Sequence, residues 1–396
     1  MSKRVLVCLV LLCVLALSAT GCTQPPQGYS GVVSSDDMLY LGATDGKVRA
    51  VYPGARSEGL PFPSAEREWS YAITMPSKAF LSCGSSTTPA TIYSTPVIVD
   101  DRVCVGIYDG KVMMLASSAR IDDLHFPHRK SGEWMYPEGD DVIGAVVGSP
   151  AVVGNTAYVC SSDGVVYALD VNSGDEEWRS ELSVEKLWTS PVVEEGALYV
   201  STFDGHIYAL STDDGRLLPW SFEAEVGFAS SPLLYGDTIL VGSFDNSLYA
   251  VRIGDDEPLW KSEGESWFWA LPVVSDDVVY AACLDGKVYA LDAGSGRAEW
   301  DEPFDAGSPI VASPVAVDDS LVIAAESGDV YIIDMETGIG VRIENPEGDE
   351  KASIDGTTVL ATLCVQDGIV YIRAQNNCLY PIDVAGRERK ARISLD

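Results

Sequence analysis

The chain has 396 residues, of which 46% are hydrophobic, 9% are aromatic and 36 are glycines. This composition is typical of a well-packed fold rich in turns and excludes an intrinsically disordered chain. The 59 acidic residues outnumber the 26 basic ones, and the formal net charge of −33 repels phosphate backbones and anionic lipid headgroups. We therefore expect no nucleic-acid partner.

Residues 1–21 have the layout of a secretory signal peptide. A basic pair at residues 3–4 precedes an unbroken apolar run at residues 5–17, and small residues then lead to Cys22. The apolar run is too short and too early to predict a membrane-spanning helix. The sequence therefore predicts an exported protein.

The string Ala19-Thr20-Gly21-Cys22 resembles a bacterial lipobox, although Ala19 stands where that motif prefers leucine. The resemblance implies that Cys22 is acylated and anchors the mature protein to a membrane. Residues 22–28 then form a short tether. An ordinary signal peptide with a chance cysteine is the alternative interpretation.

The cysteines of the mature chain fall into two groups. Cys104, Cys160 and Cys283 occupy nearly the same place in separate repeats, which favours small buried apolar residues over a disulfide framework. Cys364 and Cys378, together with Cys83, are candidates for disulfide pairing that spacing alone does not decide.

Pairs of turn residues divide the chain into eight repeated units. The pairs are Asp45-Gly46, Asp109-Gly110, Asp163-Gly164, Asp204-Gly205, Asp245-Asn246, Asp285-Gly286, Ser327-Gly328 and Asn376-Asn377. Each pair lies between two runs with strand character, such as ALYVSTF at 197–203 and HIYAL at 206–210. Because Gly and Asn tolerate positive φ, each pair predicts the turn of a β-hairpin.

Two further features complete the unit. A strand that begins with Ser-Pro, or a variant of it, precedes most hairpins, and a strand that ends the unit carries tryptophan in six of the eight. Four antiparallel strands in about 40 residues cannot bury both faces alone, so the repeat predicts an all-β, eight-bladed β-propeller. We expect the tryptophans to dock neighbouring blades, notably Trp178, Trp220, Trp260 and Trp300.

The string Ala168-Leu169-Asp170, Ser173-Gly174, Trp178 resembles the tryptophan-docking motif of pyrroloquinoline-quinone-like eight-bladed propellers, and it recurs from Ala290 to Trp300. The resemblance covers essentially the whole mature chain, as one propeller over residues 29–396. The combination of a lipoprotein-like signal with eight repeats is similar to the outer-membrane assembly lipoprotein B (BamB-like) family. That likeness implies a membrane-anchored, non-enzymatic scaffold that binds envelope proteins.

The sequence offers little catalytic chemistry. Quinone dehydrogenases with this blade resemble the chain in the blade motif only, since they are longer and use an adjacent Cys-Cys pair that is absent here. His125 and His128 lie on a predicted loop insertion without a third ligand, and His206 is expected to face solvent. We expect no catalytic residues, no metal and no cofactor. A quinone- or ligand-dependent dehydrogenase or sensor at the axial mouth is the alternative function.

Aromatic residues cluster just before the Ser-Pro strands. If these strands are innermost, as the resemblance implies, the aromatic residues surround one mouth of the axial channel and form a candidate partner-binding site. They are Tyr93, Trp188, Phe228, Trp267, Phe268 and Trp269. Packing between blades is the alternative role, because neighbouring residues in a strand point to opposite faces.

The ends and the long connections leave open points. Residues 54–68 and 77–94 exceed what a propeller turn needs, which indicates a functional or a disordered loop. The eighth unit lacks both Ser-Pro and tryptophan, so the run GYSGVV at 28–33 is a candidate to complete a blade beside it. We expect a monomeric propeller, exported and tethered to the outer face of the cytoplasmic membrane or to the outer membrane, with envelope or secreted proteins or peptides as partners.

Overall fold

The computed structural model describes residues 30–54, 62–63, 65, 67–76, 87–118, 129–182, 186–344, 354 and 357–395. The predicted signal peptide, Cys22 and the tether lie outside these residues, as do Cys83, His125 and His128. Most of the long connections at 54–68 and 77–94 also lie outside them. Within the described ranges, no helix is long and apolar enough to cross a membrane.

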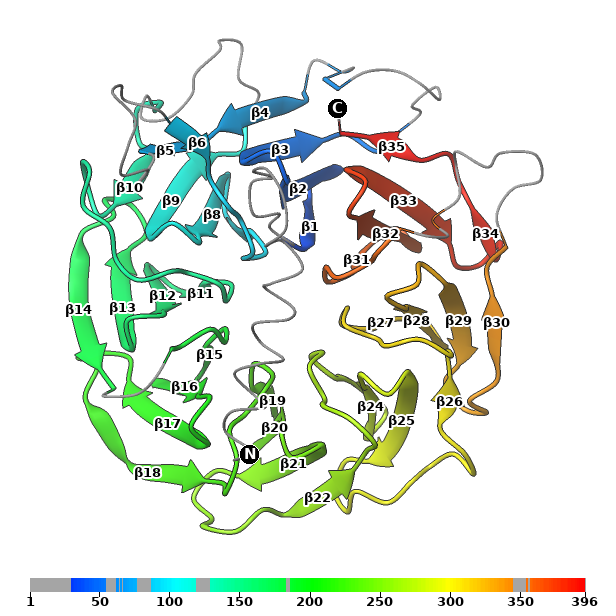
Figure 1. The fold of residues 1–396 in the computed structure, drawn as a ribbon. Helices are drawn as coiled ribbons and strands as arrows, with labels where there is room; N and C mark the ends of the chain where they lie inside the picture. The colour runs from blue at the N-terminus through cyan, green and yellow to red at the C-terminus, as the bar shows by residue number, and fades with distance from the viewer. Residues whose placement is uncertain are drawn as a thin grey trace, which may run out of the picture.

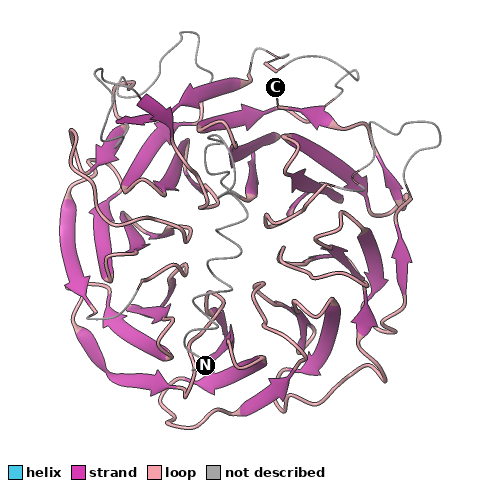
Figure 2. Cartoon of the chain, viewed as in Figure 1, coloured by secondary structure: helices cyan, strands magenta, loops and turns pink. Residues whose placement is uncertain are grey.

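Eight antiparallel sheets stand around a central axis like the blades of a propeller (Figures 1 and 2). In each sheet the strands follow one another in sequence order, and the first strand lies nearest the axis. The all-β, eight-bladed prediction is confirmed.

The strands of the first four blades have these bounds: β1 (Val32–Ser35), β2 (Met38–Gly42), β3 (Lys47–Val51), β4 (Trp69–Ala72); β7 (Val97–Val99), β8 (Arg102–Ile107), β9 (Lys111–Ala116), β10 (Trp134–Tyr136); β11 (Ala151–Val153), β12 (Thr156–Ser161), β13 (Val165–Asp170), β14 (Glu176–Glu181); β15 (Val192–Glu194), β16 (Ala197–Ser201), β17 (His206–Ser211), β18 (Leu217–Glu223). A separate hairpin, β5 (Thr74–Pro76) with β6 (Thr87–Pro89), lies between the first and second blades in the sequence.

The last four blades are built in the same way: β19 (Leu233–Tyr235), β20 (Thr238–Gly242), β21 (Ser247–Arg252), β22 (Trp260–Glu263); β23 (Val273–Ser275), β24 (Val278–Ala282), β25 (Lys287–Asp292), β26 (Phe304–Asp305); β27 (Val315–Val317), β28 (Ser320–Ala324), β29 (Val330–Asp334), β30 (Gly340–Arg342); β31 (Cys364–Gln366), β32 (Ile369–Ala374), β33 (Cys378–Asp383), β34 (Glu388–Arg389). In the eighth blade β35 (Ile393–Ser394) also pairs with β33.

The eight predicted turns join the second and third strands of the eight blades. The second residue of every turn has a positive φ, from 59° at Asn377 to 99° at Gly205. This conformation is easy for Gly and tolerated by Asn, which explains why these two residue types alone occupy the position.

A chain of hydrogen bonds runs around the axis through the Ser-Pro motif. Each proline directly precedes an innermost strand, where its missing N–H costs no ladder bond. The residue before the proline donates its backbone N–H to the serine Oγ of the next blade. The pairs are Thr95 to Ser149 (3.0 Å), Ser149 to Ser190 (2.8 Å), Ser190 to Ser231 (2.8 Å) and Leu271 to Ser313 (3.0 Å). We call this the serine belt; it joins blades two to five and blades six and seven.

Tryptophans on the outermost strands, or shortly before the strand in the case of Trp300, bridge neighbouring blades. Each indole Nε1–H donates to a backbone carbonyl just beyond the third strand of the following blade, at 2.7–3.0 Å. The pairs are Trp69 to Ser117, Trp134 to Val171, Trp178 to Thr212, Trp220 to Asp255, Trp260 to Ala293 and Trp300 to Met335. The core therefore consists of apolar clusters between blades, and six of these clusters include an indole ring.

The ring closes by side-chain packing between the first and eighth blades. The run GYSGVV does not complete the eighth blade, because its described part leads into β1, which pairs with β2 of the first blade. The seam between blades one and eight is filled by Leu39, Leu41, Leu379 and Leu395 in one apolar cluster. Cys364 carries a free thiol, so the open question of a Cys364–Cys378 disulfide is answered in the negative.

Candidate functional site

The hairpin turns lie on the same face of the propeller as the segments that lead into the innermost strands, which we call the inbound segments. In six blades the residue before the turn donates its backbone N–H to this inbound segment, for example Phe244 to Gly227 (2.9 Å) and Leu284 to Trp267 (3.0 Å). The two features therefore lie side by side around the axial mouth. We call this the turn face.

A continuous row of aromatic rings crosses the turn face over blades four to six. Trp188 lies 5.6 Å from Phe203, which lies 5.2 Å from Phe244, and Phe244 lies 5.0 Å from Trp267 and 6.5 Å from Trp269 (ring centroids). All five rings are half-buried, so each is held by its neighbours while part of it stays in contact with solvent. We call these five residues the aromatic band.

Phe228 and Phe268 belong to the core and are not available to a partner. Both are fully buried: Phe228 packs against Tyr249 (5.9 Å) and Phe268 against Tyr289 (5.4 Å). Alternation along the chain explains Phe268, because the tryptophans on either side of it point the opposite way. The prediction that Phe228 and Phe268 line the axial mouth is wrong. Both side chains pack in the apolar clusters between blades.

Tyr93 lies on the turn face but apart from the aromatic band. Its ring is half-buried and packs edge-on against Tyr108 at 5.2 Å, in the second blade. In the third blade the corresponding positions are Val147 and Ser162, so these positions place no aromatic side chain between this pair and the band. Tyr93 is therefore a secondary element of the surface.

Phe203 and Phe244 were not predicted from the sequence, because they do not lie in the segments just before the Ser-Pro strands. Each directly precedes the aspartate of a hairpin turn, and Tyr108 occupies the same place in the second blade. Aromatic side chains immediately before a turn aspartate, in three of eight repeats, are the signal that identifies them.

Acidic side chains border the aromatic band. Asp204 and Asp245 follow its two phenylalanines directly, and the exposed Glu265 lies just before Trp267. Although burial acts to raise the pKa of Asp245, hydrogen bonds from Lys261, Tyr249 and Ser243 hold it below its ordinary value. The exposed Lys186 stands 5.0 Å from the Trp188 ring centroid, so the band presents apolar surface within a mainly negative field.

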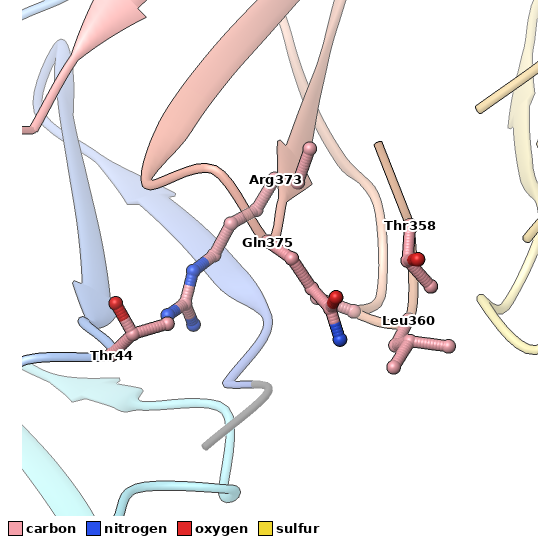
Figure 3. A pocket seen from close by; sticks show the side chains of 7 residues that line it. Thr44, Thr358, Leu360, Arg373 and Gln375 are labelled. Atoms are coloured by element: carbon pink, nitrogen blue, oxygen red, sulfur yellow. The ribbon is translucent and has the colours of Figure 1, made fainter. Parts of the chain in front are cut away.

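The described residues contain no group of three or more His, Cys, Asp or Glu side chains placed to hold a metal ion. His206 is half-buried on β17, with Asp204 Oδ1 at 3.5 Å and Glu223 Oε2 at 3.8 Å. The turn face also has a small pocket between blades eight and one. Thr44, Thr358, Arg373 and Gln375 are among the residues that line it (Figure 3).

Comparison with known proteins gives one family and a widely shared fold. Residues 130–262 and 218–394 match the family described as outer membrane protein assembly factor BamB. No curated protein sequence matches the chain significantly. The crystal structure of BamB from Moraxella catarrhalis is similar, with a TM-score of 0.63 at 16% identity over 89% of this chain and 97% of that one.

The computationally designed protein Ika8 is similar to nearly the same degree, with a TM-score of 0.62 at 14% identity over 88% of this chain and 94% of the designed one. Both solved structures establish the fold alone. The function of this chain is therefore inferred from the family match and from the residues on its own surface.

Proposed function

Because the chain belongs to the family of the outer membrane protein assembly factor BamB, we propose that it is a non-enzymatic scaffold that binds other proteins of the cell envelope. The role proposed is assistance in the assembly of envelope proteins. The aromatic band is the surface proposed for partner binding.

The single observation that carries the proposal is the aromatic band itself. Half-buried aromatic side chains that are fixed by their neighbours lose little conformational entropy on binding, and such residues contribute most to binding energy in protein interfaces. Five of them in one row, across three blades, match the length of an extended peptide segment better than a small ligand. The acidic border favours a partner segment that combines apolar with basic side chains.

Attachment to a membrane is part of the same proposal. Acylation at Cys22 anchors the chain, and residues 22–28 keep the propeller close to the membrane surface. In the outer membrane, or on the outer face of the cytoplasmic membrane, such a scaffold meets newly exported proteins. Replacing Cys22 by alanine is expected to remove acylation and to release the mature protein from the membrane fraction.

The experiment is crosslinking in cells followed by affinity purification and mass spectrometry of the bound proteins. The test variant carries Trp188→Ala with Trp269→Ala, and the matched control carries Tyr235→Ala. Tyr235 is an exposed aromatic residue that ends an innermost strand, at the face opposite the turn face. We expect an envelope-protein partner that is retained by the wild type and the control and lost by the double variant, while circular dichroism shows an intact fold.

Two results would contradict the proposal in different ways. A partner that survives the double variant would move the binding surface away from the aromatic band and leave the scaffold role in place. Failure to recover a specific envelope protein with the wild type would contradict the scaffold role itself.

A further inference from the structure

An arginine in the eighth blade occupies a position where the other seven blades have small residues. Three residues before the hairpin turn the chain carries Gly42, Gly106, Cys160, Ser201, Gly242, Ala282 and Ala324 in blades one to seven. The eighth blade carries Arg373 there, in β32. The repeat is therefore broken at one residue, and the substitution replaces a small side chain by a long cation.

Small residues at this position let the inbound segment of the next blade approach closely. A Cβ built on Gly242 would stand 1.9 Å from the Phe268 carbonyl oxygen, and one on Gly106 would stand 2.3 Å from a Val146 methyl group. At the seam the next blade is the first one, and Arg373 Nη1 donates to the Ser30 carbonyl oxygen at 2.6 Å. Arg373 thus fills space that an inbound segment fills elsewhere.

The guanidinium of Arg373 is buried but only partly satisfied. The side chain is 3% exposed, and its Nη2 has no hydrogen-bond acceptor among the described residues. Desolvation, followed by the nearby positive charge of Arg49, lowers the pKa of Arg373 to about 10, so the group is still charged at neutral pH. A buried charge without a full set of partners is strongly unfavourable.

Other charged groups lie close to Arg373. Asp45 is the acidic group that acts on Arg373, and its Oδ2 also lies 2.7 Å from Arg49 Nη2 and 3.2 Å from Lys47 Nζ. Among the described residues, Arg373 therefore shares this carboxylate with two other cations.

A pocket leads from the turn face to this arginine. It is a small cavity of about 10 Å³, and Thr44, Thr358 and Gln375 add polar side chains to its lining. Figure 3 shows Arg373 extending from β32 toward Thr44, with Gln375, Thr358 and Leu360 on the other side. The size admits a small group and excludes a large organic ligand.

We propose that this pocket is a binding site for one small monovalent anion, a halide or a single carboxylate group, held by Arg373 Nη2 at the seam between the first and eighth blades. A charge-assisted hydrogen bond from Nη2 to an anion would satisfy the free donor, and the charge of the anion would offset that of the buried guanidinium. The site does not depend on the proposed protein partner, because it is separate from the aromatic band and requires only the closed ring.

The direct test uses crystals of the mature wild-type protein soaked in sodium bromide or in sodium acetate. Bromide scatters anomalously, and we expect an anomalous peak within hydrogen-bonding distance of Arg373 Nη2. Acetate density with a carboxylate oxygen at the same place would assign the carboxylate source, and occupancy by bromide alone would assign a halide. A map that holds only water at Nη2 in both soaks would overturn the proposal.

A solution test uses variants of the full mature chain at constant ionic strength. Titration with the anion found in the crystals is expected to raise the melting temperature of the wild type by about 2 °C at about ten times the dissociation constant, and the melting temperature should keep rising with the logarithm of the anion concentration. Arg373→Met, which removes the donor at similar volume, is expected to lose this response. Arg297→Met, at an exposed arginine of the sixth blade, is the matched control and should respond as the wild type does.

The same rise in Arg373→Met as in the wild type would show a general salt effect and would contradict the proposal. If Arg373→Met does not fold, Arg373→Lys retains the charge in a smaller head group, and we expect a weaker response at higher anion concentration. The soaked wild-type crystals decide the question without any variant.

Discussion

At the scale of the single residue, the six blade-bridging tryptophans are not equivalent. In four interfaces the indole ring lies against a glycine of the next blade: Cβ atoms built on Gly174, Gly215, Gly296 and Gly338 would stand 2.4–2.7 Å from the rings of Trp134, Trp178, Trp260 and Trp300. In the fifth blade a Cβ on Gly254 would contact nothing within 4 Å, and Trp220 is correspondingly half-buried. The glycine that precedes the outermost strand in these four blades thus provides the flat surface on which the indole ring of the preceding blade stacks.

This difference predicts unequal costs for two alanine substitutions. Trp260→Ala removes a ring that is 7% exposed and its 2.8 Å hydrogen bond to Ala293, and we expect a loss of about 3–5 kcal/mol in the free energy of unfolding. Trp220→Ala removes a half-buried ring without a glycine contact and should cost at least about 1 kcal/mol less. Urea denaturation followed by far-ultraviolet circular dichroism measures both. Equal losses would show that stacking on glycine adds nothing.

A second residue-scale prediction concerns the buried thiol of Cys104. Burial raises its pKa to about 12 from an ordinary value of 9.0, against a weaker opposing effect of Arg102. Between pH 9 and pH 12 the unfolded chain loses this proton while the folded chain keeps it, so the thiol's contribution is complete below pH 9 and declines as pH rises. The expected decline between pH 9 and pH 11 is about 2 kcal/mol.

The control is Cys104→Ala, measured by urea denaturation at several pH values across the same window. The cavity lowers the stability of this variant at every pH. Its further decline above pH 9 should nevertheless be smaller than that of the wild type by about the amount that the thiol contributes. Parallel curves for the two proteins would contradict a raised pKa at Cys104.

At the scale of the element, the serine belt makes each inbound segment depend on its neighbour. Ser190 accepts a 2.8 Å hydrogen bond from the backbone N–H of Ser149 and donates its own backbone N–H to Ser231. Ser190→Ala leaves the partly buried N–H of Ser149 without its acceptor, and we expect a loss of about 1–3 kcal/mol in the free energy of unfolding. Ser221→Ala, on the exposed edge strand β18, is the matched control and should change stability by less than about 0.5 kcal/mol.

Amide hydrogen exchange locates the effect of the same substitution. Faster exchange of the Ser149 amide, with little change in the sixth and seventh blades, is the expected result for Ser190→Ala. If the two serine variants lose the same stability, the belt is a geometric coincidence of the Ser-Pro motif and not a source of stability.

The elements that local chemistry determines could be predicted from the sequence, and those that depend on a neighbour could not. The eight turns follow from residues that tolerate positive φ, and each innermost strand follows directly after its proline, except in blades one and eight. The orientation of Phe228 was not predictable from alternation, because it lies between Gly227 and Ala229 and not between two large side chains as Phe268 does. A single β-bridge between Phe228 and Ser243 orients it, and no sequence period marks this contact.

At the scale of the whole molecule, the closure of the ring was the main feature that the repeat could not predict. The missing Ser-Pro and tryptophan of the eighth unit suggested that the run GYSGVV at 28–33 would complete a blade beside it. Instead both terminal blades are continuous in sequence, and they meet through contacts of β1 with β31 and β32. The eighth unit has neither the tryptophan nor the Ser-Pro motif. Its blade has an additional strand, β35, which pairs with β33.

Because the ring closes without a strand shared between blades, the apolar packing at the seam makes the carboxyl-terminal strand important for the stability of the whole ring. Ile393 is 3% exposed and Leu395 is fully buried, and both pack in the seam cluster with Leu39, Leu41 and Leu379. The double variant Ile393→Ala, Leu395→Ala is expected to lower the free energy of unfolding by at least about 4 kcal/mol. Size-exclusion chromatography should also show an earlier elution volume at moderate urea, because an open ring has a larger radius.

The matched control is the double variant Ile339→Ala, Val341→Ala, at the outer edge of the seventh blade. These side chains are 69% and 41% exposed, so their truncation should change the free energy of unfolding by less than about 0.5 kcal/mol. If the seam is the weakest interface, hydrogen exchange in the seam variant rises first in blades one and eight and leaves blades four to six protected. Uniform exchange through all eight blades would mean instead that the ring unfolds as one cooperative unit, with the seam no weaker than the tryptophan-bridged interfaces.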